Sequence, residues 1–401
     1  MRQINIIIII LTKYFKLMGI IYFDNAATSW PKPDGIIDAV KKFNDDIGAN
    51  PGRSGHSLSI EAGRIMIDAR VAISKLFNIN DPLQIVFTKN ATEALNISIL
   101  GLLKSGDHVI TTSIEHNSVM RPLRYLEKKG IELSIVQCPE SGSIDPLSII
   151  PFIKKNTRVV IAAHASNVTG TVMPLAEIGR LTRENNIILI ADAAQTAGLL
   201  PIDVDKMNID ILAFTGHKSL FGPQGTGGLY IRKGLEDEVE PIMTGGTGSK
   251  SEFEEQPDFM PDKFESGTPN TIGIAGLGAG VEFISVTGLD SIRSKEEMLT
   301  CRFIEGLKNI KGLKIYGSTG KAQRTSVVSF NIKGMKSSDV SFELDEKYGI
   351  MSRPGLHCAP SAHRTIGTFP EGTVRFSFGY FNTAEEISTA LEAIEAISFR
   401  R

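Results

Sequence analysis

Short apolar runs rich in β-branched residues alternate with helix-like segments from about residue 60 to residue 235. Residues 91–103 and 175–184 have the apolar periodicity of helices, the first with Leu95, Ile99 and Leu102 on one face. Apolar strands that alternate with helices are typical of a parallel sheet covered by helices. The sequence therefore predicts an α/β fold with strands at residues 84–88, 108–112, 132–136, 158–163, 187–191 and 211–215.

The pattern changes after residue 242. Residues 243–270 combine glycine, proline and acidic residues with little apolar periodicity, which indicates a long functional loop or an interdomain excursion. A smaller α+β domain is predicted to follow, with helices at residues 274–307 and 383–397 and strands at residues 325–332 and 374–378. We expect an N-terminal extension over residues 1–18, a large domain over residues 35–272, and a small domain made of residues 19–34 and 273–401.

Charge and cysteine content exclude several classes of partner. The 401 residues include 43 Lys+Arg and 45 Asp+Glu, for a formal net charge of -2. This balance provides no basic field for nucleic acid or anionic lipid, so nucleic acid is not expected as a partner. The three cysteines are too few and too far apart for a disulfide framework or a CxxC metal pair. We therefore expect a reducing cytoplasmic location and no metal site.

An apolar run at residues 6–11 could be mistaken for a secretory segment. It lacks a small-residue cleavage site, and Lys13 and Lys16 follow at once. It is also much shorter than the roughly 20 apolar residues that a membrane-spanning helix needs. We interpret residues 1–18 as a disordered or weakly packed extension, with Met18 as an alternative start, and expect no membrane partner.

Polar residues recur directly after the predicted strands. In open α/β sheets the carboxyl ends of the strands border the ligand crevice. The sequence therefore predicts one site assembled from many loops, with candidate residues Thr92, His116, Asn167, Asp192, Gln195, His217 and Lys218.

Asp192 and Lys218 follow successive strands, which places a carboxylate and an amine at neighbouring strand ends. This pair matches the needs of pyridoxal phosphate, because a lysine amine forms the Schiff base and a carboxylate keeps the pyridine nitrogen protonated. A structural ion pair at the sheet edge is the alternative.

Residues 89–93 follow a strand and open a helix, so their free amides and the Thr92 hydroxyl could bind a phosphate. Thr92 is equally consistent with an ordinary N-cap. The imidazole of His116 could lie over an aromatic cofactor, although a lone histidine is more often a structural residue.

The chain from Tyr22 onward resembles the class V aminotransferase family of pyridoxal phosphate enzymes, and within it the cysteine desulfurases of the NifS/SufS type. The resemblance implies a pyridoxal-phosphate transferase of fold type I, with a large domain built on a mainly parallel sheet and a smaller α+β domain. It rests on segments that occur in the same order as in the family: residues 22–28, 90–93, 115–117, 192–195, 215–218, 264–270 and 353–360.

The resemblance also implies roles in the cofactor site. Lys218 corresponds to the Schiff-base lysine, Asp192 to the partner of the pyridine nitrogen, Gln195 to the donor to the ring's phenolic oxygen, and His116 to the residue stacked on the ring and involved in proton transfer. The residues implied for the phosphate are Ala91, Thr92, Thr215 and His217, together with Thr268, which in the family reaches the phosphate of the other subunit of a homodimer. For the substrate, the implied residues are Asn25, Ala27, His56, Asn167, Arg353 and Arg375, with Arg375 as a bidentate carboxylate clamp.

Cys358 determines the expected reaction. Cys138 and Cys301 are expected to be buried structural cysteines, whereas Cys358 lies in a glycine- and proline-rich stretch that predicts an exposed loop. Basic neighbours would favour the thiolate: Arg353, His357, His363 and Arg364. The spacing Arg-x-Gly-x-His-Cys resembles the SufS-like group, but residues 359–363 lack the glutamine that often follows Cys-Ala there, which leaves the sulfur acceptor open.

The resemblance therefore implies a cysteine desulfurase that converts L-cysteine to L-alanine and holds the sulfur as a persulfide on Cys358. A selenocysteine lyase is the nearest alternative, followed by a class V aminotransferase or epimerase, which would have no use for Cys358. A non-catalytic sulfur carrier is disfavoured by the intact Lys218, Asp192 and Cys358. The expected acceptor of the sulfur is a protein or a small thiol.

Overall fold

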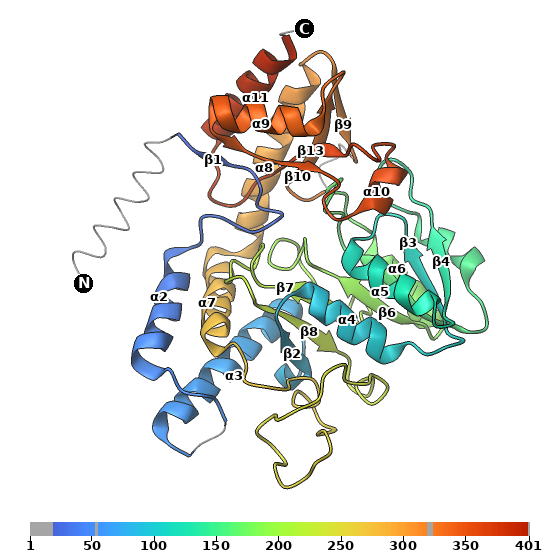
Figure 1. The fold of residues 1–401 in the computed structure, drawn as a ribbon, viewed down its shortest axis with the longest axis vertical. Helices are drawn as coiled ribbons and strands as arrows, with labels where there is room; N and C mark the ends of the chain where they lie inside the picture. Colours follow the sequence, from blue (N-terminus) through green and yellow to red (C-terminus); the bar gives the residue numbers. More distant parts are fainter. Residues whose placement is uncertain (1–18, 53–54, 319–323, 400–401) are drawn as a thin grey trace.

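The computed structural model describes residues 19–52, 55–318 and 324–399 (Figure 1). The prediction for residues 1–18 falls outside this part of the chain. Among the described helices, none alone has both the length and the apolar composition needed to cross a membrane.

A seven-stranded sheet forms the centre of the larger part of the molecule, with strand order β2-β8-β7-β6-β5-β3-β4. Every strand predicted between residues 84 and 215 is present within one residue of its expected bounds. The exception to the parallel arrangement is β8, which runs antiparallel to both neighbours and was not expected. The strands are β2 (Ile85–Thr88), β3 (His108–Thr112), β4 (Glu132–Val136), β5 (Thr157–Ala163), β6 (Ile188–Asp192), β7 (Ile211–Thr215) and β8 (Gly227–Ile231).

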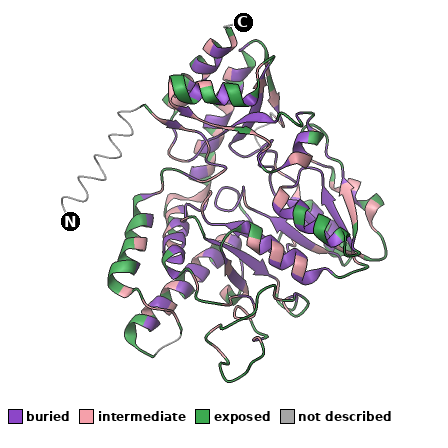
Figure 2. Cartoon of the chain, in the orientation of Figure 1, coloured by how far each residue is buried: buried purple, intermediate pink, exposed green. Residues whose placement is uncertain are grey.

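Helices cover both faces of this sheet, as Figures 1 and 2 show. One face packs against α4 and α5 through a cluster that includes Leu95 and Leu123. The other face packs against α3, α6 and α7 through a cluster that includes Phe77, Ile178 and Leu277. Successive strand residues alternate between the two clusters, which explains why these strands are apolar on both sides. The helices are α2 (Asp34–Lys42), α3 (Ser57–Phe77), α4 (Ala91–Leu102), α5 (Asn117–Glu127), α6 (Leu175–Glu184) and α7 (Thr271–Thr287).

The C-terminal part contains a four-stranded antiparallel sheet of order β12-β13-β10-β9. Its core is rich in phenylalanine, and Phe303 and Phe376 stack with their ring centroids 5.1 Å apart. The N-terminal strand β1 (Ile21–Tyr22) joins this part by pairing with β11 (Ile350–Met351). The remaining elements are α8 (Leu289–Lys308), β9 (Leu313–Tyr316), β10 (Val327–Ile332), α9 (Ser337–Tyr348), β12 (Arg353–Gly355), α10 (Pro360–Thr365), β13 (Thr373–Ser377) and α11 (Ala384–Phe399).

Residues 274–307 were predicted to form a single helix, but the structure has two helices there. α7 and α8 meet at Gly288 with a bend of 83°. Gly288 has a φ of +85°, a left-handed conformation that glycine adopts without steric cost. The bend lets α7 pack on α3 while α8 packs on the C-terminal sheet.

Candidate active site

A cavity lies at the carboxyl ends of β2, β3, β5, β6 and β7. It contains all the polar residues that the sequence places directly after strands, because parallel strands bring their following loops to one edge of the sheet. Its polar lining comprises Asn90, Thr92, His116, Ser118, Ser166, Asn167, Asp192, Gln195, Thr215, His217 and Lys218.

Asp192 and Lys218 face this cavity from neighbouring strands, β6 and the end of β7. Burial raises the pKa of Asp192, against the opposing effects of the Ala194 N–H, 2.9 Å from Oδ1, and of the Lys218 charge. Burial lowers the pKa of Lys218 to about 8, with the Asp192 charge acting in the opposite direction. Within the described residues the two side chains interact electrostatically but form no direct salt bridge.

The beginning of α4 supplies donors to the same cavity. Asn90 caps the helix by accepting a hydrogen bond of 3.0 Å from the Glu93 N–H, and the Thr92 hydroxyl lies 2.7 Å from the Ser118 hydroxyl. In the described residues, Oγ1 of Thr215 and Nδ1 of His217 are buried without a hydrogen-bond partner. Buried polar atoms are normally satisfied, so these two atoms beside a helix N-terminus fit a phosphate group.

His116 is the N-cap of α5. Its Nδ1 accepts a hydrogen bond of 3.0 Å from the Ser118 N–H, so the neutral ring carries its proton on Nε2. Burial, together with the charges of Lys218, Arg353, Arg375 and Arg121, lowers the pKa of His116 to about 4. The imidazole is therefore neutral at physiological pH.

The N-terminal loop reaches the lysine from the opposite side. The Ser29 hydroxyl donates to the Lys218 carbonyl at 2.8 Å, and its N–H donates to the His217 carbonyl at 3.0 Å. Nε2 of Gln195 donates to the Ala26 carbonyl at 3.2 Å. Asn25 lines a small adjoining cavity with Gln195. The loop thus fixes the peptide that carries Lys218.

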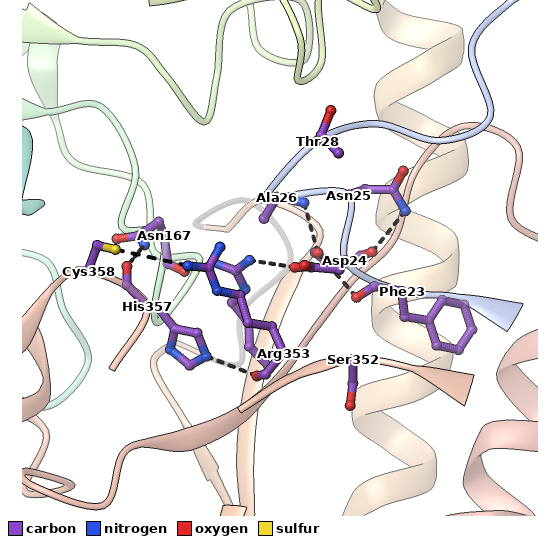
Figure 3. A network of polar contacts seen from close by, with 12 residues as sticks. Phe23, Asp24, Asn25, Ala26, Thr28, Asn167, Ser352, Arg353, His357 and Cys358 are labelled. Atoms are coloured by element: carbon purple, nitrogen blue, oxygen red, sulfur yellow. Dashed lines mark hydrogen bonds and ion pairs between the residues drawn. The ribbon is translucent and has the colours of Figure 1, made fainter. Parts of the chain in front are cut away.

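Figure 3 shows a second group of polar contacts, which includes Asp24, Asn167 and His357. Arg375, in β13, pairs with the first two of these residues. One of its terminal nitrogens lies 2.7 Å from Oδ1 of Asp24, and the other donates to the Asn167 carbonyl at 3.1 Å. The side chain is 1% exposed, and its Nε has no partner among the described residues. Burial lowers the pKa of Arg375, while Asp24 opposes this effect. A buried guanidinium with one unsatisfied nitrogen suits an incoming carboxylate.

Cys358 is exposed, and its Sγ lies 3.9 Å from a terminal nitrogen of Arg353. The expectation that His357 and His363 add positive charge near the thiol is wrong. Both imidazoles are buried, and burial lowers the pKa of His363 to about 4 and that of His357 well below its ordinary value. The guanidinium of Arg364 lies over the Phe369 ring, 4.2 Å from its centroid.

The other two cysteines are more enclosed than Cys358. Cys138 is buried, as expected, whereas Cys301 is half-buried. Burial raises the pKa of the Cys138 thiol, which makes it a poor nucleophile.

Seven predicted residues are absent from the lining of the cavity that contains Lys218. Asn25, Arg353, Cys358 and Arg375 are described above, and the other three lie as follows. Thr268 lines a second cavity together with Lys89 and Glu93, beside the beginning of α4. His56 is the N-cap of α3, where its Nδ1 accepts from the Ser59 N–H at 3.2 Å. Ala27 lies in the N-terminal loop, where its N–H donates to the Asp24 carbonyl at 3.0 Å.

Ser29 and Ser118 are not among the residues predicted from sequence. Ser118 could have been found, because it follows Glu115-His116-Asn117 in the first turn of a helix that begins after a strand. Ser29 carries no local signal, since its partners lie almost 190 residues away along the chain.

Comparison with known proteins places these features in a family. The family model described as aminotransferase class-V matches residues 21–389. A probable cysteine desulfurase from Methanothermobacter thermautotrophicus is 36% identical over 384 residues, 94% of each chain, and one from Pyrococcus abyssi is 37% identical over 389 residues, again 94% of each. An apo structure of a cysteine desulfurase from Thermococcus onnurineus NA1 is 35% identical, with a TM-score of 0.90 over 95% of each chain.

Proposed function

The chain belongs to the class-V aminotransferase family, and from that membership we propose that it is a pyridoxal-phosphate-dependent cysteine desulfurase. It converts L-cysteine to L-alanine and retains the sulfur as a persulfide on Cys358. One observation supports this assignment above the others. The backbone N–H of Asn117, the residue after His116, donates a hydrogen bond to the Cys358 carbonyl, and His116 lines the cavity of Lys218 and Asp192. A transaminase would need that cavity but would not need an exposed cysteine beside it.

The residues of the cavity fit the cofactor. Lys218 would attach it covalently, Asp192 would keep a proton on its pyridine nitrogen, and Gln195 would donate to its phenolic oxygen. Thr215 and His217, whose buried polar atoms lack described partners, would bind the phosphate together with Ala91, Thr92 and the α4 amides. When bound, the cofactor supplies an electron sink for charge that develops at the substrate's α carbon.

Side chains of this protein carry out the remaining steps of the proposed reaction. Arg375 and Asn167 would orient the substrate carboxylate, with Asn25, Ala27, His56 and Arg353 completing the site. Nζ of Lys218, with a pKa of about 8, is neutral in an appreciable fraction of molecules near pH 8 and can accept the α proton. His116 would stack on the ring and assist proton transfer.

Sγ of Cys358 then attacks the substrate sulfur. A sulfur–sulfur bond forms while the carbon–sulfur bond breaks, and the electron pair of the broken bond passes to the β carbon. Protonation of the β carbon, followed by return of a proton from Lys218 to the α carbon, gives alanine, and the persulfide remains on the protein. A sulfur-accepting protein or small thiol would later remove it.

The protein is further proposed to act as a cytoplasmic homodimer. Thr268 lies beside the beginning of α4 but outside its own chain's Lys218 cavity, and the dimer would bring it to the partner's phosphate. Residues 35–272 would form the large cofactor-binding domain, and residues 19–34 and 273–401 the small one. The seven-stranded sheet lies in the first of these ranges and the four-stranded sheet in the second, which supports this division.

The test is an anaerobic assay of the purified protein with cysteine, selenocysteine and other amino acids, in the presence of a thiol reductant that releases persulfide sulfur as sulfide, in which alanine and sulfide are measured together. Equal yields of both from cysteine support the proposal. Turnover of selenocysteine alone would indicate a lyase for that substrate, and amino-group transfer without sulfide would indicate a transaminase.

A further inference from the structure

A chain of hydrogen bonds connects buried side chains within residues 353–368, the segment that contains Cys358. These hydrogen bonds take no direct part in the reaction proposed above. Nε2 of His357 lies 3.0 Å from the Arg353 carbonyl oxygen. Nδ1 of His357 lies 3.2 Å from Nε2 of His363, and Nδ1 of His363 lies 2.7 Å from the Thr368 hydroxyl. His357 is 4% exposed and His363 is fully buried.

The chemistry of these atoms fixes every proton along this chain of hydrogen bonds. A carbonyl oxygen can only accept, so His357 must carry its proton on Nε2. Nδ1 of the neutral His357 ring is then an acceptor, which requires His363 to donate from Nε2. Nδ1 of His363 is in turn an acceptor and takes the hydroxyl proton of Thr368. Burial and the charge of Arg375 lower the pKa of both rings and keep them neutral, against the opposing effect of the Arg353 carbonyl at His357.

The chain of hydrogen bonds ends at a strained part of the backbone. His357 and Cys358 have φ values of +50° and +57°, in the left-handed region that residues with a side chain seldom occupy. Such a conformation is energetically unfavourable for these residues and persists only where the surroundings hold it. The His357 carbonyl accepts from Nδ2 of Asn167 at 2.7 Å, so His357 is held through its ring and through its main chain.

We propose that His363 is a positioning residue for sulfur transfer: together with Thr368 it fixes the tautomer and orientation of His357, and His357 holds the left-handed turn that presents the Cys358 thiol to the substrate. The proposal deepens the proposed function and rests on it where the measured step is sulfur transfer to Cys358. No atom of His363 or Thr368 needs to touch the substrate, because both act through His357.

The test compares two pairs of variants in the holoenzyme. His363→Leu removes both hydrogen bonds, and His363→Gln keeps a donor to His357. Thr368→Val removes the hydroxyl with little change of volume, and Thr368→Ser keeps it. Three quantities are measured: exchange of the substrate's α proton with solvent deuterium, single-turnover formation of persulfide mapped to Cys358, and amide hydrogen exchange over residues 353–365.

In His363→Leu we expect persulfide formation to slow by about tenfold or more, the size of effect that loss of a buried hydrogen bond produces. Exchange of the α proton, which precedes sulfur transfer, should stay close to the wild-type rate, and amides of residues 353–365 should exchange faster. His363→Gln should recover part of the transfer rate. Thr368→Val should show a smaller defect of the same kind, and Thr368→Ser none.

If α-proton exchange slows as much as persulfide formation in a variant that folds and retains its cofactor, the defect is not confined to sulfur transfer and the proposal is contradicted. A wild-type rate of persulfide formation in His363→Leu would also contradict the proposal, as would unchanged amide exchange in that variant. If His363→Leu does not fold, the same measurements on Thr368→Val decide. If the wild-type protein forms no persulfide on Cys358, the proposed function fails. Amide exchange then still shows whether His363 holds the turn.

Discussion

The backbone N–H of Asn117 donates a hydrogen bond of 2.8 Å to the carbonyl oxygen of Cys358. Asn117 begins α5 directly after His116, on the seven-stranded sheet, whereas Cys358 follows β12 of the four-stranded sheet. This main-chain contact joins the loop beside the Lys218 cavity to the turn that carries the thiol. Nδ2 of Asn167, which lines the cavity, adds a second contact to the same turn by donating to the His357 carbonyl at 2.7 Å.

Lys218 is expected to be the lysine that binds the cofactor. The purified protein should show a visible absorbance band, and borohydride should fix the cofactor to one peptide containing Lys218. Lys32 is the matched control, because burial also lowers its pKa to about 8 and its Nζ lies 2.9 Å from the His217 carbonyl. Lys32→Ala should keep the band and Lys218→Ala should lose it. Recovery of the label on Lys32 would reverse the assignment.

Cys358→Ser should abolish cysteine turnover while the absorbance band and α-proton exchange remain. Loss of a catalytic nucleophile typically costs several orders of magnitude, so the fall should be at least roughly 10³-fold. Selenocysteine cleavage should decline less, since selenium leaves with less assistance. Cys138→Ser and Cys301→Ser serve as controls and should keep activity. Mapping of the persulfide to either of them would contradict the role of Cys358.

Complementation in mixed dimers tests whether subunits share their sites. Lys218→Ala and Thr268→Ala chains should each be inactive or strongly impaired alone. A mixed dimer should contain one pocket without either lesion, so mixing should restore activity toward half of the wild-type value per mixed dimer. An active monomer in sedimentation, or no recovery from two inactive parents, is incompatible with shared sites.

A buried ion pair anchors the segment that leads to Thr268. Oε2 of Glu265 lies 2.5 Å from a terminal nitrogen of Arg70, whose side chain is 4% exposed. Glu265→Ala should lower the free energy of unfolding by about 3–5 kcal/mol, because it leaves a buried charge unpaired. Glu61→Ala removes the exposed partner of Arg64 and should cost no more than about 1 kcal/mol. Urea unfolding of both variants measures the contrast, and equal losses would show that the buried pair has no special weight.

Because of Glu296, the free energy of unfolding should fall as pH rises. Burial raises its pKa to about 8, against the weaker opposing effect of the Ser326 hydroxyl, 2.7 Å from Oε2. The folded state therefore binds more protons than the unfolded state between the ordinary pKa of glutamate and about pH 8, and stability declines across that window. Wild-type protein should lose roughly 2 kcal/mol between about pH 6 and pH 8 from this residue. Glu296→Gln should show a flatter profile in urea titrations, and an unchanged slope would exclude this cause.

The local sequence pattern was sufficient to predict six of the seven strands of the large sheet, but not β8. β6 and β7 are apolar up to their last residue, and β5 is apolar from Val159 onward, so their sequences alone mark them as buried strands. β8 begins with Gly227-Gly228, whose weak strand propensity conceals it, and Phe214 of β7 occupies the space that a side chain at Gly228 would need. The break at Gly288 was equally hidden, because both flanking segments are helical.

The cavity residues could be predicted for a topological reason, since parallel strands deliver their following loops to one edge. Contacts between distant segments could not. The pairing of Arg375 with Asp24, and the enclosure of His357 and His363, depend on how the C-terminal sheet meets the N-terminal loop. A histidine next to a cysteine in sequence suggests a charge, and only its burial shows that it is neutral.

The pairing of β1 with β11 has a consequence for folding of the chain during its synthesis. Ile21 and Phe23 are synthesised more than 300 residues before Ile350 and the rings of Phe376 and Phe378 that bury them. The seven-stranded sheet can assemble meanwhile, but the peptide of Lys218 does not acquire its final support from Ser29 until the N-terminal loop has packed against the C-terminal sheet. The site of a newly synthesised chain is therefore complete only after residues 350–378 have emerged, and Ile21 and Phe23 must be kept from other partners until then.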